Sequence, residues 1–179
     1  VCRKACGFDS HLRYKFYITQ YSSIVLKEKI KPYHINKQQK YDIAYLKMAA
    51  EWAELSNCER KKVGALIVKD RMIISDGYNG TPSGFDNCCE DENGETKWYV
   101  LHAEANAILK VANSTNSCDG STLYLTLSPC RECAKLIHQS GIKRLVYIKK
   151  YKDDAGLRFL KKAGIELSQI ESGSFEKSK

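Results

Sequence analysis

Hydrophobic side chains recur with helical spacing soon after the first 37 residues. Ile43, Leu46, Ala50 and Ala53 follow one another at intervals of three or four residues, which places them on one face of an α-helix. This spacing predicts an amphipathic helix over residues 38–55.

Other apolar runs are short and lack helical spacing, as expected for strands. Residues 122–127 alternate leucine with threonine or tyrosine, which is the period-two pattern of a β-strand. Residues 63–68 and 72–75 are separated only by three charged residues, and this predicts a β-hairpin. The whole pattern predicts five strands, at 63–68, 72–75, 122–127, 143–148 and 164–168.

Three further predicted helices alternate with the later strands. One starts at His102, one follows Pro129 and ends before Gly141, and one spans residues 153–163. Glycine suits the position after a helix because it tolerates a left-handed backbone. Alternating helices and strands form parallel pairs in a layered α/β sheet, and the opening hairpin makes this sheet mixed.

The chain of 179 residues is long enough for one domain with a sizeable core. We predict that the domain spans residues 38–170. Residues 1–37 show no steady period, so we expect a basic N-terminal extension that is disordered or not native. Residues 171–179 are predicted to be a polar tail.

Most of the net charge lies in the extension. The whole chain has 29 basic and 21 acidic residues, a net charge of +8. Residues 1–40 hold nine basic and two acidic residues (+7), which leaves 20 basic and 19 acidic residues (+1) for the rest. A nearly neutral domain lacks the basic field that attracts a polynucleotide, so no polynucleotide partner is expected.

The sequence shows no sign of export or of membrane insertion. No apolar run has the length of a membrane span, and no signal peptide opens the chain. We therefore expect a reducing cytoplasm, in which the eight cysteines serve as ligands or thiols. No methionine precedes Met48, and a start there would delete the core positions Ile43 and Leu46. The native protein is therefore expected to start near Ile35 or Asn36 from an alternative codon, or else the chain is a fragment.

Two short motifs supply the side chains of a metal site. H-A-E at 102–104 and S-P-C-R-E-C at 128–133 bring one imidazole, two thiols and a carboxylate. Cysteines three residues apart share one face of a helix. The serine and proline of the second motif suit the N-cap and the first helical position, which would place both thiols in the first turn.

We predict that His102, Cys130 and Cys133 bind one catalytic zinc ion and that Glu104 is the catalytic proton carrier. Catalytic zinc takes three protein ligands and leaves one position to water, and H-x-E followed by P-C-x-x-C is the signature of zinc-dependent deaminases. Alone, C-x-x-C is often structural or redox-active, and a first-turn glutamate often only balances the helix dipole. His138 is a rival ligand, but it lies roughly 12 Å along the helix from Cys130.

From about residue 41 to 170 the chain resembles the deoxycytidylate deaminases of the cytidine-deaminase superfamily. The matching segments are V-G-A at 63–65, G-Y-N-G at 77–80, H-A-E-A-N-A-I at 102–108, T-L-S-P-C-R-E-C-A-K at 126–135 and G-I-K at 141–143. The zinc motifs are shared across the superfamily. G-Y-N-G, which by spacing alone is a turn signal, is more particular to this family when N-C-C follows it at 87–89.

The resemblance implies a three-layer α/β/α fold around the five-stranded sheet. It implies conversion of dCMP to dUMP with release of ammonia, which feeds dTMP synthesis. Asn79 and Tyr151 would contact the nucleotide, and the backbone of Ala103 and Ser128 would read the base. The resemblance also implies a homo-oligomer, a hexamer or a dimer, with dCTP and dTTP as effectors.

A second, structural zinc is not expected. Some relatives bind it through cysteines that match Cys58 and Cys88 together with a histidine shortly before the catalytic one. Residues 90–101 contain no histidine, and two cysteines alone make a weak zinc site. We therefore expect Cys58 and Cys88 to be small buried thiols.

Three other kinds of protein share parts of this pattern. A tRNA adenosine deaminase, the main alternative, has the same zinc motifs but needs an electropositive face. The deaminase domain of riboflavin biosynthesis usually carries a longer cysteine motif. A structural zinc module would not need Glu104 and would fill the fourth zinc position with another cysteine or histidine.

Overall fold

The computed structural model describes residues 36–171. The predicted extension up to residue 35 and the tail from residue 172 lie outside the described residues. Lys37 is already helical and Asn36 caps that helix, since its Oδ1 accepts from the backbone N of Gln39. Helix α2 with its cap therefore begins two residues before the predicted boundary at 38.

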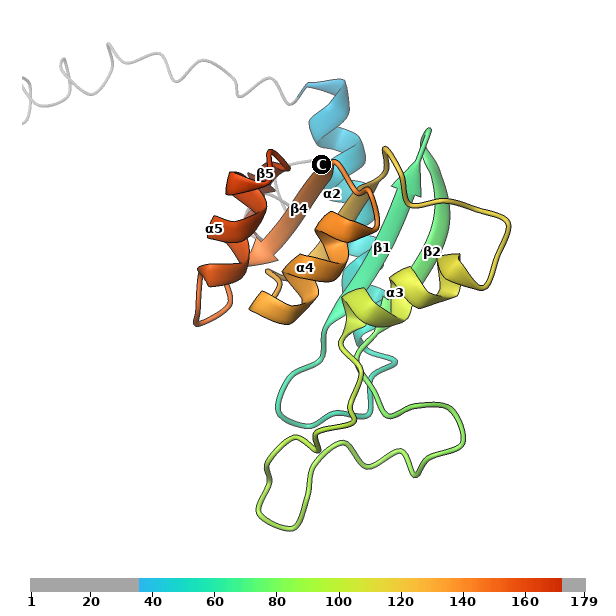
Figure 1. Cartoon of the computed structure of the whole chain (residues 1–179), viewed down its shortest axis with the longest axis vertical. Coiled ribbons are helices and arrows are strands. Elements are labelled where there is room, and N and C mark those ends of the chain that lie inside the picture. Colours follow the sequence, from blue (N-terminus) through green and yellow to red (C-terminus); the bar gives the residue numbers. More distant parts are fainter. Residues whose placement is uncertain (1–35, 172–179) are drawn as a thin grey trace, which may run out of the picture. The chain divides into compact units, whose positions relative to one another are not determined.

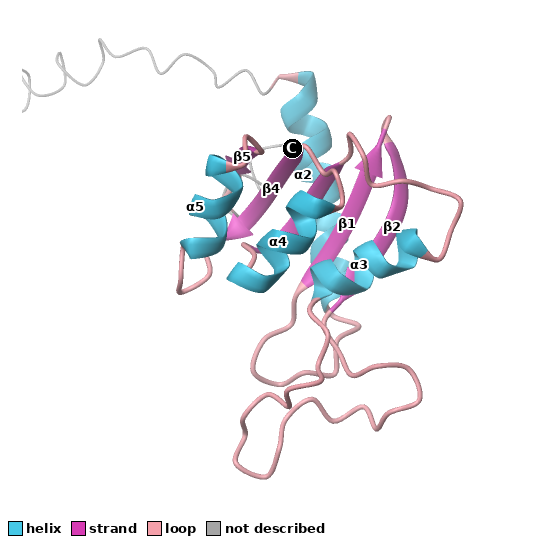
Figure 2. Cartoon of the chain, in the orientation of Figure 1, coloured by secondary structure: helices cyan, strands magenta, loops and turns pink. Residues whose placement is uncertain are grey.

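Within the described residues, four helices and five strands alternate as the sequence predicts (Figures 1 and 2). The elements are α2 Lys37–Ala53, β1 Gly64–Lys69, β2 Met72–Tyr78, α3 Ala103–Ala112, β3 Thr122–Leu127, α4 Arg131–Gln139, β4 Arg144–Lys149, α5 Ala155–Lys162 and β5 Glu166–Gln169. No helix of the described part is long and apolar enough to span a membrane.

The strands form one mixed sheet in the order β2-β1-β3-β4-β5. β1 pairs antiparallel with both β2 and β3, whereas β3, β4 and β5 run parallel. The start of β1 therefore lies at the same edge of the sheet as the carboxyl ends of β3 and β4. The predicted mixed five-stranded sheet is confirmed.

Helices cover both faces of the sheet, which confirms the three-layer α/β/α arrangement (Figure 1). α3, α4 and α5 share one face, where Ile67, Leu123, Leu125 and Leu145 form the main hydrophobic core with them. α2 covers the other face. The alternation of leucine with polar residues in β3 matches this arrangement, except that Tyr124 is also buried, against α2.

The hairpin is longer than predicted because pairing continues beyond Ser75 to Tyr78, opposite Gly64. Gly77 permits this extension. A Cβ at Gly77 would lie 2.3 Å from the carbonyl oxygen of Ala103, so only glycine lets β2 pass this close to the start of α3.

α4 begins two residues later than predicted, with Arg131 and not Pro129 at the first helical position. Ser128 does not cap the helix, because its hydroxyl accepts a hydrogen bond from the backbone N of Tyr151 at 2.8 Å. Its own N–H donates to the carbonyl oxygen of Lys149. Cys130 is therefore the N-cap residue, and Cys133 alone lies within the first turn.

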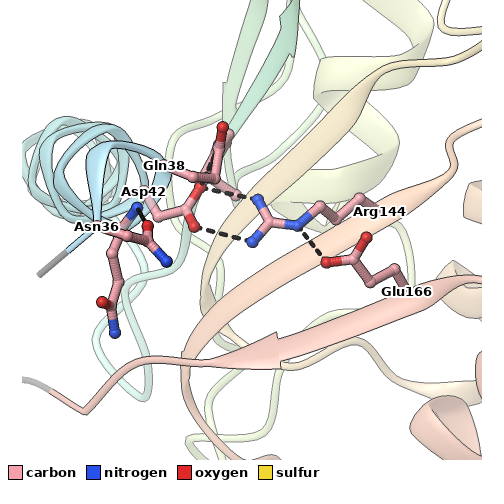
Figure 3. A network of polar contacts seen from close by, with 7 residues as sticks. Asn36, Gln38, Asp42, Arg144 and Glu166 are labelled. Carbon is pink, nitrogen blue, oxygen red and sulfur yellow. Dashed lines mark hydrogen bonds and ion pairs between the residues drawn. The ribbon is translucent and has the colours of Figure 1, made fainter.

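An ion-pair network joins α2 to the sheet (Figure 3). Asp42 is 2% exposed and faces the sheet from a helix predicted to bury only apolar residues. Arg144 of β4 donates to both of its carboxylate oxygens at 2.8 Å and to Glu166 of β5 at 2.8 Å. Tyr124 donates to the same carboxylate. Ala49 rather than the predicted Ala50 completes the buried face of α2.

Candidate active site

The amino ends of α3 and α4 bring the predicted zinc ligands together (Figure 1). His102 is the N-cap residue of α3 and Cys130 is the N-cap residue of α4. The Nδ1 atom of His102 lies 3.3 Å from the Sγ of Cys133 and 3.5 Å from the Sγ of Cys130. The histidine thus presents one ring nitrogen to both sulfurs.

These distances fit a zinc ion. Zn–N and Zn–S bonds of about 2.0 and 2.3 Å at a tetrahedral angle separate nitrogen from sulfur by roughly 3.5 Å. The ligand atoms of His102, Cys130 and Cys133 all lie within 4.8 Å of one another. Within the described residues, this cluster of three is the set whose geometry could hold a metal, and Glu104 is not part of it.

The electrostatics of the cluster favour a thiolate even without a cation. A hydrogen bond from Cys133 lowers the pKa of Cys130 to about 3, and His102 acts in the same direction. The same hydrogen bond, together with burial, raises the pKa of Cys133. A cation bound to both sulfurs removes this asymmetry because it stabilises both thiolates.

Glu104 lies in the first turn of α3 and is 4% exposed. Burial raises the pKa of its carboxyl to about 6, although the positive charge of His102 acts against this. A carboxyl with a pKa near neutrality can both accept and release a proton.

A pocket of about 500 Å³ opens beside the cluster, a volume typical of small-ligand sites. Every predicted site residue except Cys133 lines it; Cys133 is 3% exposed and lies buried beside it. The predicted residues in the lining are Asn79, His102, Ala103, Glu104, Ser128, Cys130 and Tyr151.

Asn79 is more than the turn residue that its spacing indicates. It is 9% exposed. Its Oδ1 accepts from the backbone N of Val63 at 2.7 Å, and its Nδ2 donates to the carbonyl oxygen of Lys61 at 2.8 Å. Asn79 therefore holds the segment before β1 against the end of β2.

The charged side chains at the pocket mouth were not predicted. Arg60, Lys61, Glu90, Glu95 and Lys152 also line the pocket. A usable signal was present: basic runs occur just before the first strand of the hairpin and just after the fourth strand. An antiparallel first strand brings these two runs to one edge of the sheet.

The cysteines outside the zinc motif differ from the prediction. Cys58 forms a disulfide with Cys89, and Cys88 is exposed. The prediction that Cys58 and Cys88 are both buried thiols is therefore wrong. No pattern within the sequence shows whether Cys88 or Cys89 is the disulfide partner of Cys58, because the path of the loop decides which of the two neighbouring thiols faces Cys58.

An α/β/α sheet with a His-Cys-Cys cluster and a buried glutamate at two helix starts defines the class of zinc-dependent hydrolytic deaminases. The chain belongs to the cytidine and deoxycytidylate deaminase family, whose zinc-binding region matches residues 39–149.

Individual relatives agree with this assignment. The deoxycytidylate deaminase of Enterobacteria phage T4 is 35% identical over 175 residues, covering 74% of this chain and 91% of its own. The deoxycytidylate deaminase of Mycobacterium phage D29 is 40% identical over 128 residues, covering 61% and 94%. The crystal structure of dCMP deaminase from cyanophage S-TIM5 in complex with dCMP and dUMP is 46% identical, with a TM-score of 0.72, and covers 76% of this chain and all of that one.

Proposed function

We propose that the chain is a dCMP deaminase that hydrolyses dCMP to dUMP and ammonia with one zinc ion held by His102, Cys130 and Cys133. The observation that carries the proposal is the cluster itself, which lies beside a pocket of nucleotide size with Glu104 buried next to it. The solved relative in complex with dCMP and dUMP supports the choice of substrate.

The chemistry divides between the metal and the chain. Zinc, when bound, supplies a Lewis acid that lowers the pKa of water towards neutrality. We assign to Glu104 the transfer of protons from water to the ring nitrogen and to the departing amine. Water provides the oxygen of the new carbonyl group, and ammonia leaves with the former exocyclic nitrogen.

Backbone groups at the two helix starts are proposed to read the base. Because the N–H of Ser128 is engaged with Lys149, the carbonyl oxygen of Ser128 is the group left to accept from the exocyclic amine. Ala103 follows the ligand His102 at the start of α3 and lines the same pocket. Its backbone is proposed to read the other polar edge of the ring.

Asn79 and Tyr151 are proposed to contact the sugar and phosphate. Both line the pocket. The Nδ2 atom of Asn79 carries a second hydrogen that can donate to the nucleotide. Tyr151 is fixed through its backbone bond to Ser128, so its ring is held near the metal-binding loop.

Several expectations accompany this function as further proposals. These are assembly into a hexamer or dimer, regulation by dCTP and dTTP, a role in supplying dTMP synthesis, and a cytoplasmic location. The absence of a second zinc also stays a prediction. The Cys58–Cys89 disulfide was not expected for a chain in a reducing compartment.

The proposal is tested by measuring ammonia release from the purified full chain with four substrates. These are dCMP, deoxycytidine, CMP and a tRNA hairpin that carries adenosine. We expect dCMP to be turned over with the highest kcat/KM. Turnover of the hairpin in place of dCMP would contradict the proposal and favour the tRNA alternative.

A further inference from the structure

Two cations that line the pocket, Lys61 and Lys152, form no ion pair within the described residues. Arg60 is paired with Glu95. Lys62, the neighbour of Lys61, is outside the pocket lining and pairs with Glu54. The positive charge of Lys61 is therefore directed towards the pocket and is not neutralised there.

The backbone of Lys61 is fixed by buried contacts. Its carbonyl oxygen accepts from the Nδ2 of Asn79, whose Oδ1 binds the backbone N of Val63. The carbonyl oxygen of Asn79 accepts in turn from the hydroxyl of Ser56 at 2.7 Å. Asn79 thus holds Lys61 at the start of β1, at the edge of the sheet where the metal ligands lie.

The side chain of Lys61 reaches the ring of Tyr151, which also lines the pocket. Its Nζ lies 5.1 Å from the centroid of the Tyr151 ring. Tyr151 is bonded to Ser128, two residues before the ligand Cys130. The ammonium group is therefore positioned relative to the metal cluster by the bond of its own backbone to Asn79 and by the ring of Tyr151.

The contact with Tyr151 leaves the ammonium group of Lys61 available to bind a phosphate. A cation on an exposed aromatic face is weakly held, whereas a charge-assisted hydrogen bond to a phosphate dianion is much stronger. A phosphate that enters the mouth can draw the ammonium from the ring face without unfolding any element. Lys152 lines the same mouth, but it has neither of the two anchoring contacts described for Lys61.

We propose that Lys61 is a specificity-determining residue that binds the 5′-phosphate and makes the site select nucleoside monophosphates over nucleosides. This inference rests on the proposed deaminase function and adds a particular residue for the phosphate. Besides its own proposed contact with the nucleotide, Asn79 positions the backbone of Lys61.

The test compares steady-state kinetics of Lys61→Gln and the wild type on dCMP and on deoxycytidine. Loss of one charge-assisted contact should lower kcat/KM for dCMP roughly 10- to 100-fold, mainly through KM. Turnover of deoxycytidine should stay within about twofold of the wild-type value, because that substrate has no phosphate for Lys61 to bind. Lys61→Arg should restore most of the activity on dCMP.

Lys62→Gln is the matched control, since it removes the neighbouring charge outside the pocket and should leave both substrates unaffected. Zinc content and thermal midpoint are measured for every variant. An unchanged ratio of kcat/KM for dCMP to that for deoxycytidine in Lys61→Gln would overturn the inference, as would equal losses on both substrates. A wild-type protein that does not deaminate dCMP would instead overturn the proposed function itself.

Discussion

Gly156 of α5 lies directly against the carbonyl oxygen of Pro129. A Cβ at this glycine would lie 2.3 Å from that oxygen and 2.9 Å from the carbonyl oxygen of Cys130. Because Gly156 has no side chain, the loop that carries the proposed zinc ligand Cys130 can pack directly against α5.

Gly156→Ala is expected to weaken zinc binding. Alanine normally stabilises a helix by about 1 kcal/mol relative to glycine, but here its methyl group must displace the Pro129–Cys130 backbone. We expect zinc to be lost more readily to a chelator, with a lower kcat, while circular dichroism shows the helices intact. Gly80→Ala is the control, because its Cβ would meet no atom closer than 4.0 Å. Equal zinc retention in both variants would refute this reasoning.

Glu104→Gln should separate proton transfer from metal binding. Glutamine keeps the shape of the side chain but cannot carry the proton, so we expect kcat to fall about 10²- to 10⁴-fold. Zinc content should stay at the wild-type value, because Glu104 lies outside the metal cluster. Glu132→Gln, on the exposed first turn of α4, should behave as the wild type. Loss of zinc in Glu104→Gln would assign this residue to the ligands.

Cys130→Ala should abolish zinc binding. A site with only one thiolate and one imidazole has too few ligands to hold the ion tightly. Elemental analysis after dialysis should give about one equivalent for the wild type and close to none for the variant. Cys88→Ser, which removes an exposed thiol outside the cluster, should retain the wild-type amount. Two equivalents in the wild type would contradict the prediction of a single zinc.

Asp42→Asn should destabilise the fold by about 3 kcal/mol at pH 7, since it leaves the half-buried Arg144 guanidinium without its main partner. Burial alone would raise the pKa of Asp42, but hydrogen bonds from Arg144, Gln38 and Tyr124 outweigh it and lower the pKa. The carboxylate therefore stabilises the fold above its unfolded pKa of about 4. This stabilisation is lost as the pH falls towards the lower folded pKa.

Urea unfolding at several pH values checks this prediction. The difference in unfolding free energy between the wild type and Asp42→Asn should be largest near neutrality and should shrink below about pH 4. Arg158→Gln, which removes an exposed ion pair with Asp154, should cost less than about 1 kcal/mol at any pH. A gap between the wild type and Asp42→Asn that does not depend on pH would show that the charge of Asp42 is not what stabilises the network.

The sequence predicts best where local pattern decides the structure. The bounds of β3 were predicted correctly because alternation continues throughout that strand, and His102 was correctly placed at a helix start. The start of α4 was wrong because the hydroxyl of Ser128 binds Tyr151, 23 residues further along. The burial of the charged residue Asp42 could not be predicted either, because its partner Arg144 lies 102 residues away in the sequence.

The predicted ligands and glutamate were brought together as expected, since both motifs stand at helix starts that meet at one edge of the sheet. Lys61 was missed because a charged residue before a strand is usually exposed to solvent on every side. Its significance depends on the buried carboxamide of Asn79, which local spacing indicates only as part of a turn. Side chains that position other residues through long-range contacts are thus the part that local pattern does not reveal.

The Cys58–Cys89 disulfide and the ligand pair Cys130 and Cys133 need opposite redox states within one chain. The disulfide closes a ring that contains the whole β1–β2 hairpin, with a sequence separation of 31 between the two cysteines. A ring of that size stabilises a fold by roughly 3 to 4 kcal/mol through the unfolded chain. Cys130 and Cys133, in contrast, can bind a metal only in the reduced state. A reductant strong enough to protect the metal ligands would therefore open the ring, and an oxidant that closes the ring would attack any ligand pair without its ion. Metal occupancy is then what allows both pairs to persist in the same molecule, because a coordinated thiolate is shielded while the Cys58–Cys89 pair stays oxidised.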